Sequence, residues 1–147
     1  MKIFIPFTKS PTATLLALRG YEAQCLAMLN SHSYFEYFKQ RWAEKESFIN
    51  VEHDIVPWPG AIDEIEKCQE MWCGYGYNKY ENIVLSPYLG CVKIGAELIA
   101  RLPDVWNERE KESREWGNLD VWLCNYAWNR GIKIHQHYPS VNHFKEG

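Results

Sequence analysis

An apolar segment that ends abruptly in two acids constrains the fold of this chain more than any other feature. Residues 48–51 read Phe-Ile-Asn-Val, and Glu52, His53 and Asp54 follow before Pro57 closes the segment. A short run rich in β-branched residues is typical of a buried strand. Because carboxylates are costly to bury, we expect this strand to deliver both acids to a solvent-facing edge of a sheet. In α/β proteins, that edge is where ligands bind.

Strand and helix patterns alternate along the rest of the chain. This order favours an α/β sandwich, with a small, mainly parallel sheet of about four to six strands flanked by helices. Residues 14–18 fit either a short strand or the start of a helix, and the charged segment 104–117 fits a solvated helix or a loop over a site. The Gly- and Tyr-rich segment 72–80 is predicted to be a loop. The predicted strands are 2–7, 48–51 and 132–137, and the predicted helices are 34–43, 61–68, 90–102 and 119–129.

Length, charge and cysteine content limit the class of protein. The 147 residues predict one domain, spanning 1–147. A net charge of −3 argues against general nucleic-acid binding, which normally needs a basic face. No apolar run approaches the roughly 20 residues that a membrane span needs. Five scattered cysteines predict reduced thiols and a cytoplasmic location, and the spacing of Cys68 and Cys73 is wider than that of a typical zinc-knuckle pair.

Glu52 and Asp54 are the first candidate site residues. Side chains alternate along a strand, so residues two apart point to the same side and His53 is expected to face the other side. Two carboxylates on one side repel each other unless one is protonated or a cation lies between them, and Mg²⁺ and Mn²⁺ prefer such oxygen ligands. The alternative is that one acid caps the next helix while the other pairs with a lysine.

Three histidines lie close together near the end of the chain. His135 and His137 alternate along the predicted last strand, and His143 follows the turn expected at Pro139. One of these histidines, added to the two acids, would give a mixed oxygen and nitrogen site that suits Mn²⁺. The alternatives are ordinary surface histidines, or a zinc site formed by His135, His137 and cysteines.

Asp120 is the candidate catalytic residue. It lies at the start of a predicted helix, shortly after Trp116 and Gly117, with Asn118 as the expected cap. An acid at this position stabilises the positive end of a helix whatever else it does. The alternative role is that of a catalytic base at the rim of a pocket.

The order of these motifs resembles the GT-A class of nucleotide-sugar-dependent glycosyltransferases, in a reduced form. Ile5-Pro6-Phe7-Thr8 is similar to the first strand and loop of that class, and Glu52-His53-Asp54 takes the place of its Asp-x-Asp metal motif. Residues 89–93 are similar to its glycine-containing segment near the sugar and acceptor, and residues 116–120 to its acidic motif at a helix start. The chain differs from that class in its short length and in the glutamate at the first motif position.

The resemblance implies a metal-dependent transfer of a sugar from a nucleoside-diphosphate sugar, with a UDP-sugar as first choice, to an acceptor that the sequence does not identify. It implies Mn²⁺ or Mg²⁺ as cofactor, held by Asp54, His143 and Glu52, with His137 as the alternative histidine. Asp120 would be the catalytic base.

The remaining residues that the resemblance assigns bind the nucleotide sugar; they are Pro6, Phe7, Thr8 and Glu52. Two other functions stay open, namely a catalytically inactive module that binds a nucleotide sugar or a glycan, and a small zinc-binding protein. The oligomeric state is also open, a homo-oligomer included.

Overall fold

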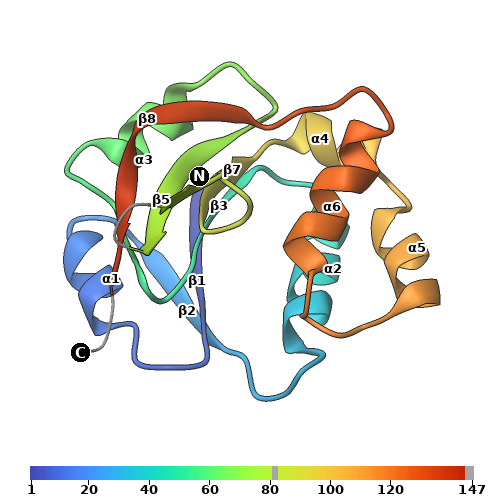
Figure 1. The fold of residues 1–147 in the computed structure, drawn as a ribbon, viewed down its shortest axis with the longest axis horizontal. Coiled ribbons are helices and arrows are strands. Elements are labelled where there is room, and N and C mark those ends of the chain that lie inside the picture. Colours follow the sequence, from blue (N-terminus) through green and yellow to red (C-terminus); the bar gives the residue numbers. More distant parts are fainter. Residues whose placement is uncertain (81–82, 145–147) are drawn as a thin grey trace.

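The computed structural model describes residues 1–80 and 83–144, with the backbone alone for 78–80 and 83–85. Its strands form one mixed sheet with helices on both faces (Figure 1). β6 (Ile83–Leu85) pairs with β5 beside the main order of strands. In that order the strands are β2 (Ala23–Ala27), β1 (Lys2–Phe7), β3 (Phe48–Val51), β7 (Cys91–Ile94), β5 (Trp72–Tyr80), β8 (His135–His143) and β4 (Ile55–Val56).

The sheet is not mainly parallel, so that prediction is wrong. β1 is parallel to both β2 and β3, and β5 is parallel to β8. β7 is antiparallel to both β3 and β5, β4 is antiparallel to β8, and β6 is antiparallel to β5. The reason is that β5, β6 and β7 follow one another with no intervening helix in the described residues, and short connections can join only antiparallel neighbours.

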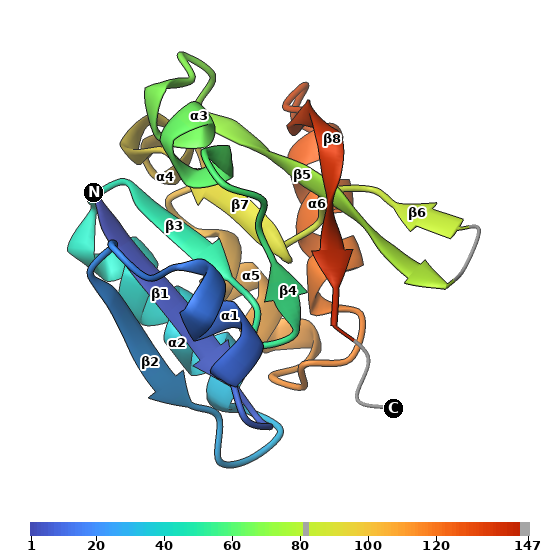
Figure 2. The same cartoon turned by 90° about the vertical axis from the view of Figure 1, so that its left-hand side faces the viewer.

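The helices divide between the two faces of the sheet, as the two views show (Figures 1 and 2). α1 (Thr12–Ala17) and α3 (Ala61–Lys67) cover one face, where Ile62 and Ile65 belong to the same buried cluster as Tyr75. On the other face lie α2 (Ser33–Glu44), α4 (Ala96–Arg101), α5 (Val105–Glu112) and α6 (Leu119–Trp128). There Trp106 stacks on Phe38 at 5.6 Å between ring centroids, so much of the aromatic content forms core. No helix in the described part of the chain is both long and apolar enough to cross a membrane.

Several predicted elements are confirmed and two are wrong. The strands at 2–7 and 48–51 have the predicted bounds, α2, α3 and α6 match their predicted helices, and residues 14–17 are helical. The segment 72–80 is a strand, and 90–102 contains β7 before α4. β5 lacks a polar face because Trp72 packs on one side of the sheet and Cys73 on the other. Gly74 lies where β5 and β7 approach closely, and a Cβ atom at this position would lie 2.5 Å from the Cys91 carbonyl oxygen.

The last strand also differs from its prediction. β8 begins at His135 and continues to His143, beyond the expected turn at Pro139. The register against β5 shifts between the pairs Tyr75–His137 and Tyr77–Val141, so Pro139 lies in an irregular stretch of the ladder. Proline lacks a backbone N–H and is tolerated at such irregularities. The continued strand brings His143 to the same end of the molecule as the acids after β3.

Candidate functional site

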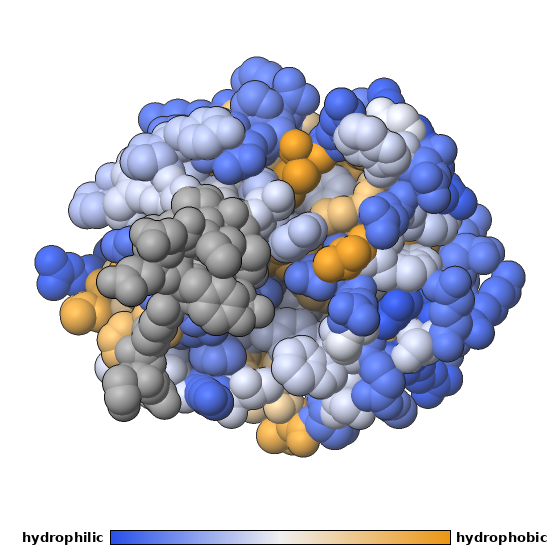
Figure 3. All heavy atoms as spheres, viewed as in Figure 1, coloured by the Kyte–Doolittle hydropathy of each residue, from blue (hydrophilic) through white to orange (hydrophobic). Residues whose placement is uncertain are grey.

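A cavity of about 680 Å³ opens at the edge of the sheet where the parallel strands β1 and β3 end. Its walls come from the loop after β1, the turn after β3, the loop before α6 and the end of β8. The face of the molecule in Figure 3 is mostly hydrophilic, with a few hydrophobic side chains near its middle. Ligands bind in α/β proteins at such carboxyl ends of strands, so this cavity is the candidate functional site.

Glu52, His53 and Asp54 reach the cavity from a turn. β3 ends at Val51, and the Ile55 N–H donates a hydrogen bond to the Glu52 carbonyl at 3.1 Å. All three residues line the cavity. They lie in a turn, where strand alternation does not apply, so the direction expected for the His53 side chain stays a prediction.

Thr14 of α1 contacts the backbone of this turn through its hydroxyl group. Its side chain is fully buried, and its hydroxyl lies 2.7 Å from the carbonyl oxygens of both His53 and Ile55. A hydroxyl has one hydrogen, so it donates to one of these carbonyls at a time. Nothing local in the sequence marks Thr14 as a partner of this turn, because the two are some 40 residues apart in the chain.

Asp54 and His143 meet through the pairing of β4 with β8. Ile55 lies opposite His143 in this antiparallel ladder, and the Phe144 N–H donates to the Asp54 carbonyl at 2.6 Å. Asp54 Oδ2 consequently lies 2.8 Å from His143 Nε2. Asp54 Oδ1 and His143 Nδ1 are buried and have no hydrogen-bond partner among the described residues. Buried polar atoms are nearly always paired, so these two atoms are typical of a site that awaits a ligand.

Burial and the negative charge of the cavity raise the pKa values of two tyrosines. Burial raises the pKa of Tyr77 well above its usual value, and the carboxylates of Glu52, Asp120 and Asp54 raise it further. The pKa of Tyr34 is raised in the same way, by burial first and then by Glu52 and Asp54. Both phenols therefore stay protonated and can donate hydrogen bonds, while the surrounding carboxylates favour a cation. The Tyr77 ring also stacks on His143, with 6.0 Å between ring centroids.

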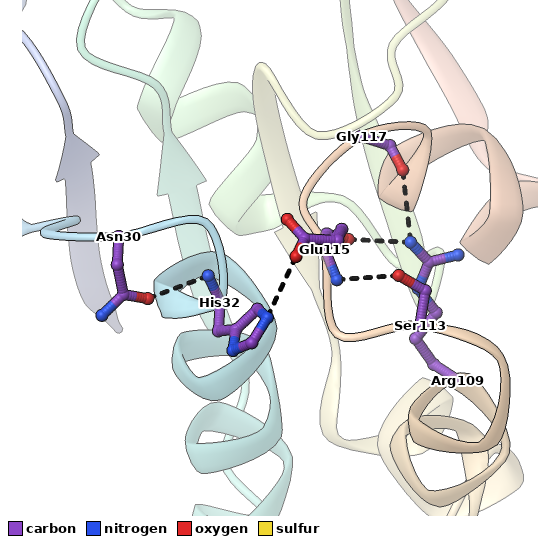
Figure 4. Close-up of polar contacts among 6 residues, drawn as sticks. All are labelled: Asn30, His32, Arg109, Ser113, Glu115 and Gly117. Carbon is purple, nitrogen blue, oxygen red and sulfur yellow. Dashed lines mark hydrogen bonds and ion pairs between the residues drawn. The ribbon is translucent and has the colours of Figure 1, made fainter.

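Buried Arg109 of α5 shapes the loop that forms one wall (Figure 4). Its Nη2 donates to the carbonyl oxygens of Glu115, at 2.8 Å, and Gly117, at 3.2 Å. The Glu115 N–H donates to Ser113 Oγ at 3.0 Å, and the Glu115 carboxylate lies 3.1 Å from His32 Nε2. This loop is therefore tied both to α5 and to the segment before α2.

The same loop places Trp116 and Asp120 on the cavity wall. Trp116 donates its backbone N–H to the Ser31 carbonyl at 3.1 Å, and its ring stacks on Tyr34 with 6.3 Å between centroids. Asp120 lies in the first turn of α6, and its Oδ1 accepts the N–H of Val121 at 2.8 Å. Asn118 occupies the N-cap position with a φ of 59°, but its side chain makes no capping hydrogen bond.

The structure brings most of the predicted site residues together. The cavity is lined by Thr8, Glu52, Asp54, Asp120 and His143. Their roles stay predictions. The cavity is also lined by residues that the sequence pattern did not assign to it, among them Lys9, Tyr34 and Phe144.

Three predicted residues lie elsewhere. Pro6 is buried within β1 opposite Leu26, and Phe7 is the last residue of that strand. His137 lies near the opposite end of β8 from His143 and pairs with Glu64 of α3 at 2.9 Å. None of the three lines the cavity, so His143, and not His137, is the predicted metal-binding histidine that lies beside the acids.

Asp54 and His143 fit a divalent cation of the magnesium or manganese type. Among the described residues, no third acidic, histidine or cysteine ligand atom lies within 4.8 Å of both, so Glu52 does not complete a three-ligand cluster. Mg²⁺ commonly uses one or two protein ligands and completes its shell with water and substrate phosphates. The orphaned Asp54 Oδ1 suits such a site.

A solved glycosyltransferase shares this fold. The structure of a glycosyltransferase involved in the glycosylation of the major capsid of PBCV-1 aligns over 100% of this chain and 96% of its own, with a TM-score of 0.59 and 12% identity. A197 from STIV aligns over 69% of each chain, with a TM-score of 0.49 and 17% identity. No protein-family model matches the chain. No curated protein matches it either. The chain therefore has a glycosyltransferase-like α/β fold, with its cavity at the carboxyl ends of β1 and β3.

Proposed function

We propose that the protein is a glycosyltransferase that moves a sugar from a nucleoside-diphosphate sugar, with UDP-sugars as first choice, to an acceptor, in a reaction that depends on Mn²⁺ or Mg²⁺. The observation that carries the proposal is the pair of Asp54 and His143, 2.8 Å apart, with a buried Asp54 oxygen that has no hydrogen-bond partner in the part of the chain that the structure describes. The pair lines a cavity large enough for a small-molecule ligand. The fold shared with a glycosyltransferase supports the same reaction class.

Departure of the nucleoside diphosphate is the difficult step, because negative charge builds up on its phosphate oxygens. Asp54 and His143 would hold the cation, and its positive charge would offset the negative charge that develops on these oxygens in the transition state. Tyr77 carries a phenol that stays protonated beside this pair and would donate a hydrogen bond to the same group. Lys9, which also lines the cavity, would add a positive charge toward the phosphates.

The other walls of the cavity would position the two substrates. The stacked rings of Trp116 and Tyr34 offer an aromatic surface to a base or a sugar ring. Thr8 and Glu52 would bind the ribose or a sugar hydroxyl. Asp120, on the wall formed by α6, would take the proton from the acceptor hydroxyl as it attacks the sugar.

The proposal is tested by calorimetric titration of the protein with UDP, with and without Mn²⁺. We expect binding that requires Mn²⁺ and that weakens at least tenfold in Asp54→Asn. The matched control is Asp104→Asn, because Asp104 is exposed and lies outside the cavity. Binding that is equally strong without Mn²⁺, or that is unchanged in Asp54→Asn, would contradict the proposed site.

A further inference from the structure

A second cluster of metal-ligating side chains lies between α3 and the sheet. Cys68 follows α3 directly, Cys73 is on β5 and His137 is on β8. The two thiol sulfurs and a ring nitrogen of His137 all lie within 4.8 Å of one another. None of the three residues lines the cavity.

The topology explains how residues so far apart in the sequence converge. β5 and β8 are parallel neighbours, with Cys73 opposite His135 and Tyr75 opposite His137. Cys73 is fully buried on the face that α3 covers, and its Sγ lies 3.8 Å from the Ile65 carbonyl oxygen. α3 ends over this point of the sheet, so the short connection to β5 brings Cys68 back toward Cys73.

His137 is oriented as a metal-ligating histidine usually is. Its Nδ1 lies 2.9 Å from a carboxylate oxygen of Glu64, and 14% of its side chain is exposed. Its Nε2 is buried and has no hydrogen-bond partner among the described residues. Histidine ligands typically donate one ring N–H to a carboxylate, which fixes the tautomer and leaves the other nitrogen free to bind the metal.

The charges around the cluster suit a divalent ion bound by two thiolates. The charges of the ion and two thiolates sum to zero, and the carboxylate of Glu64 is 40% exposed, so it keeps its contact with solvent. Lys93 is 5% exposed and donates a hydrogen bond to the Cys68 carbonyl. Since a buried net charge is costly, a neutral arrangement of this kind favours occupancy.

We propose that Cys68, Cys73 and His137 bind Zn²⁺ at a site separate from the cavity. Two sulfur ligands and one nitrogen ligand suit Zn²⁺, whereas Mg²⁺ and Mn²⁺ prefer oxygen. As the two Zn–S bonds form, both thiol protons pass to solvent. The fourth position of the tetrahedral ion is open to water, because Cys68 and His137 are partly exposed. The ion would join α3 to β5 and β8.

Zinc content of the full chain tests this site. The reduced protein is equilibrated with Zn²⁺, passed over a weak chelating resin and analysed for metal. We expect one zinc per chain in the wild type and in Cys25→Ser, an exposed cysteine outside the cluster, and almost none in Cys68→Ser or His137→Gln. Cys68→Ser is the principal variant because that thiol is only partly buried, and its folding is verified by circular dichroism.

Cobalt substitution identifies the ligands in the same proteins. We expect Co²⁺ to give thiolate charge-transfer absorption and the strong visible bands of a tetrahedral ion in the wild type and in Asp54→Asn, and neither in folded Cys68→Ser. Three results would overturn the proposal: a wild type without zinc, a Cys68→Ser protein that keeps as much zinc as the wild type, or zinc that is lost in Asp54→Asn, which would place the ion in the cavity.

Discussion

Asp54 and His143 are 89 residues apart in sequence, yet their side chains form a hydrogen bond because His143 lies opposite Ile55 in the pairing of β4 with β8. The pair leaves one buried oxygen and one buried nitrogen without partners among the described residues. A side chain fixed by one hydrogen bond and open at its other atom can bind a ligand with little reorganisation. For this reason we expect the cation at Asp54 and His143 and not at exposed acids elsewhere on the surface.

Asp120 should affect turnover without affecting the cation. Asp120→Asn keeps the shape of the side chain but removes the group that would accept the proton of the acceptor. We expect kcat to fall by about 10²- to 10⁴-fold, the usual contribution of a general base. Mn²⁺-dependent UDP binding, measured by calorimetry, should stay within a factor of two of the wild-type value. A variant that turns over at the wild-type rate would leave Asp120 with a capping role alone.

At the scale of elements, the turn between β3 and β4 depends on α1. Thr14 is the side chain through which α1 contacts the backbone of this turn, and its hydroxyl is buried against two carbonyl oxygens. The position of Glu52 and Asp54 therefore depends in part on this helix of six residues, together with the backbone hydrogen bonds that join the turn to Gly90 and Phe144.

Thr14→Val should destabilise the protein and disturb the turn, because it replaces the hydroxyl by a methyl group of similar size. Buried carbonyls that lose their donor cost about 1–3 kcal/mol, and we expect a loss of that size in the free energy of unfolding, measured with urea. Thr12→Val is the control, because Thr12 lies in the same helix but is exposed. Equal losses in the two variants would assign the effect to removal of a hydroxyl from α1 in general and not to the contact with the turn.

The elements that the sequence predicted correctly are those with local signals. The apolar run at 48–51 and the helical spacing of α2 need no knowledge of distant residues. β5 was missed because both of its faces are covered, which removes the alternation of apolar and polar residues. The length of β8 was missed because Pro139 normally ends a strand, whereas here it lies in an irregular stretch of the ladder.

The residues of the candidate site also differ in whether a local sequence signal predicts them. Glu52, Asp54 and Asp120 were predicted because acids at the ends of apolar segments stand out in a sequence. Tyr34 and Arg109 were missed, because their roles come from contacts across the fold: one ring stacked beside the cavity, and one guanidinium that holds the loop after α5. Such contacts leave no mark on the pattern of neighbouring residues.

Across the whole molecule, β8 connects the two sites that we propose. His137 near its start belongs to the cysteine cluster under α3, and His143 at its end belongs to the cavity. The two proposed sites differ in their ligands, with sulfur and nitrogen between α3 and the sheet and mainly oxygen at the edge of the sheet, so ligand chemistry would favour a different metal at each. A cytoplasmic location and the oligomeric state stay predictions for this chain.

The most direct test of the proposed function is the release of UDP from a panel of UDP-sugars in the presence of Mn²⁺, compared between the wild type and Asp54→Asn. We expect the wild type to release UDP from at least one donor, to lose this activity when EDTA removes the cation, and to be at least 100-fold faster than Asp54→Asn. Mn²⁺-dependent binding of UDP without release from any donor would indicate an inactive binding module. Release at the same rate in Asp54→Asn, or neither binding nor release, would contradict a metal-dependent glycosyltransferase.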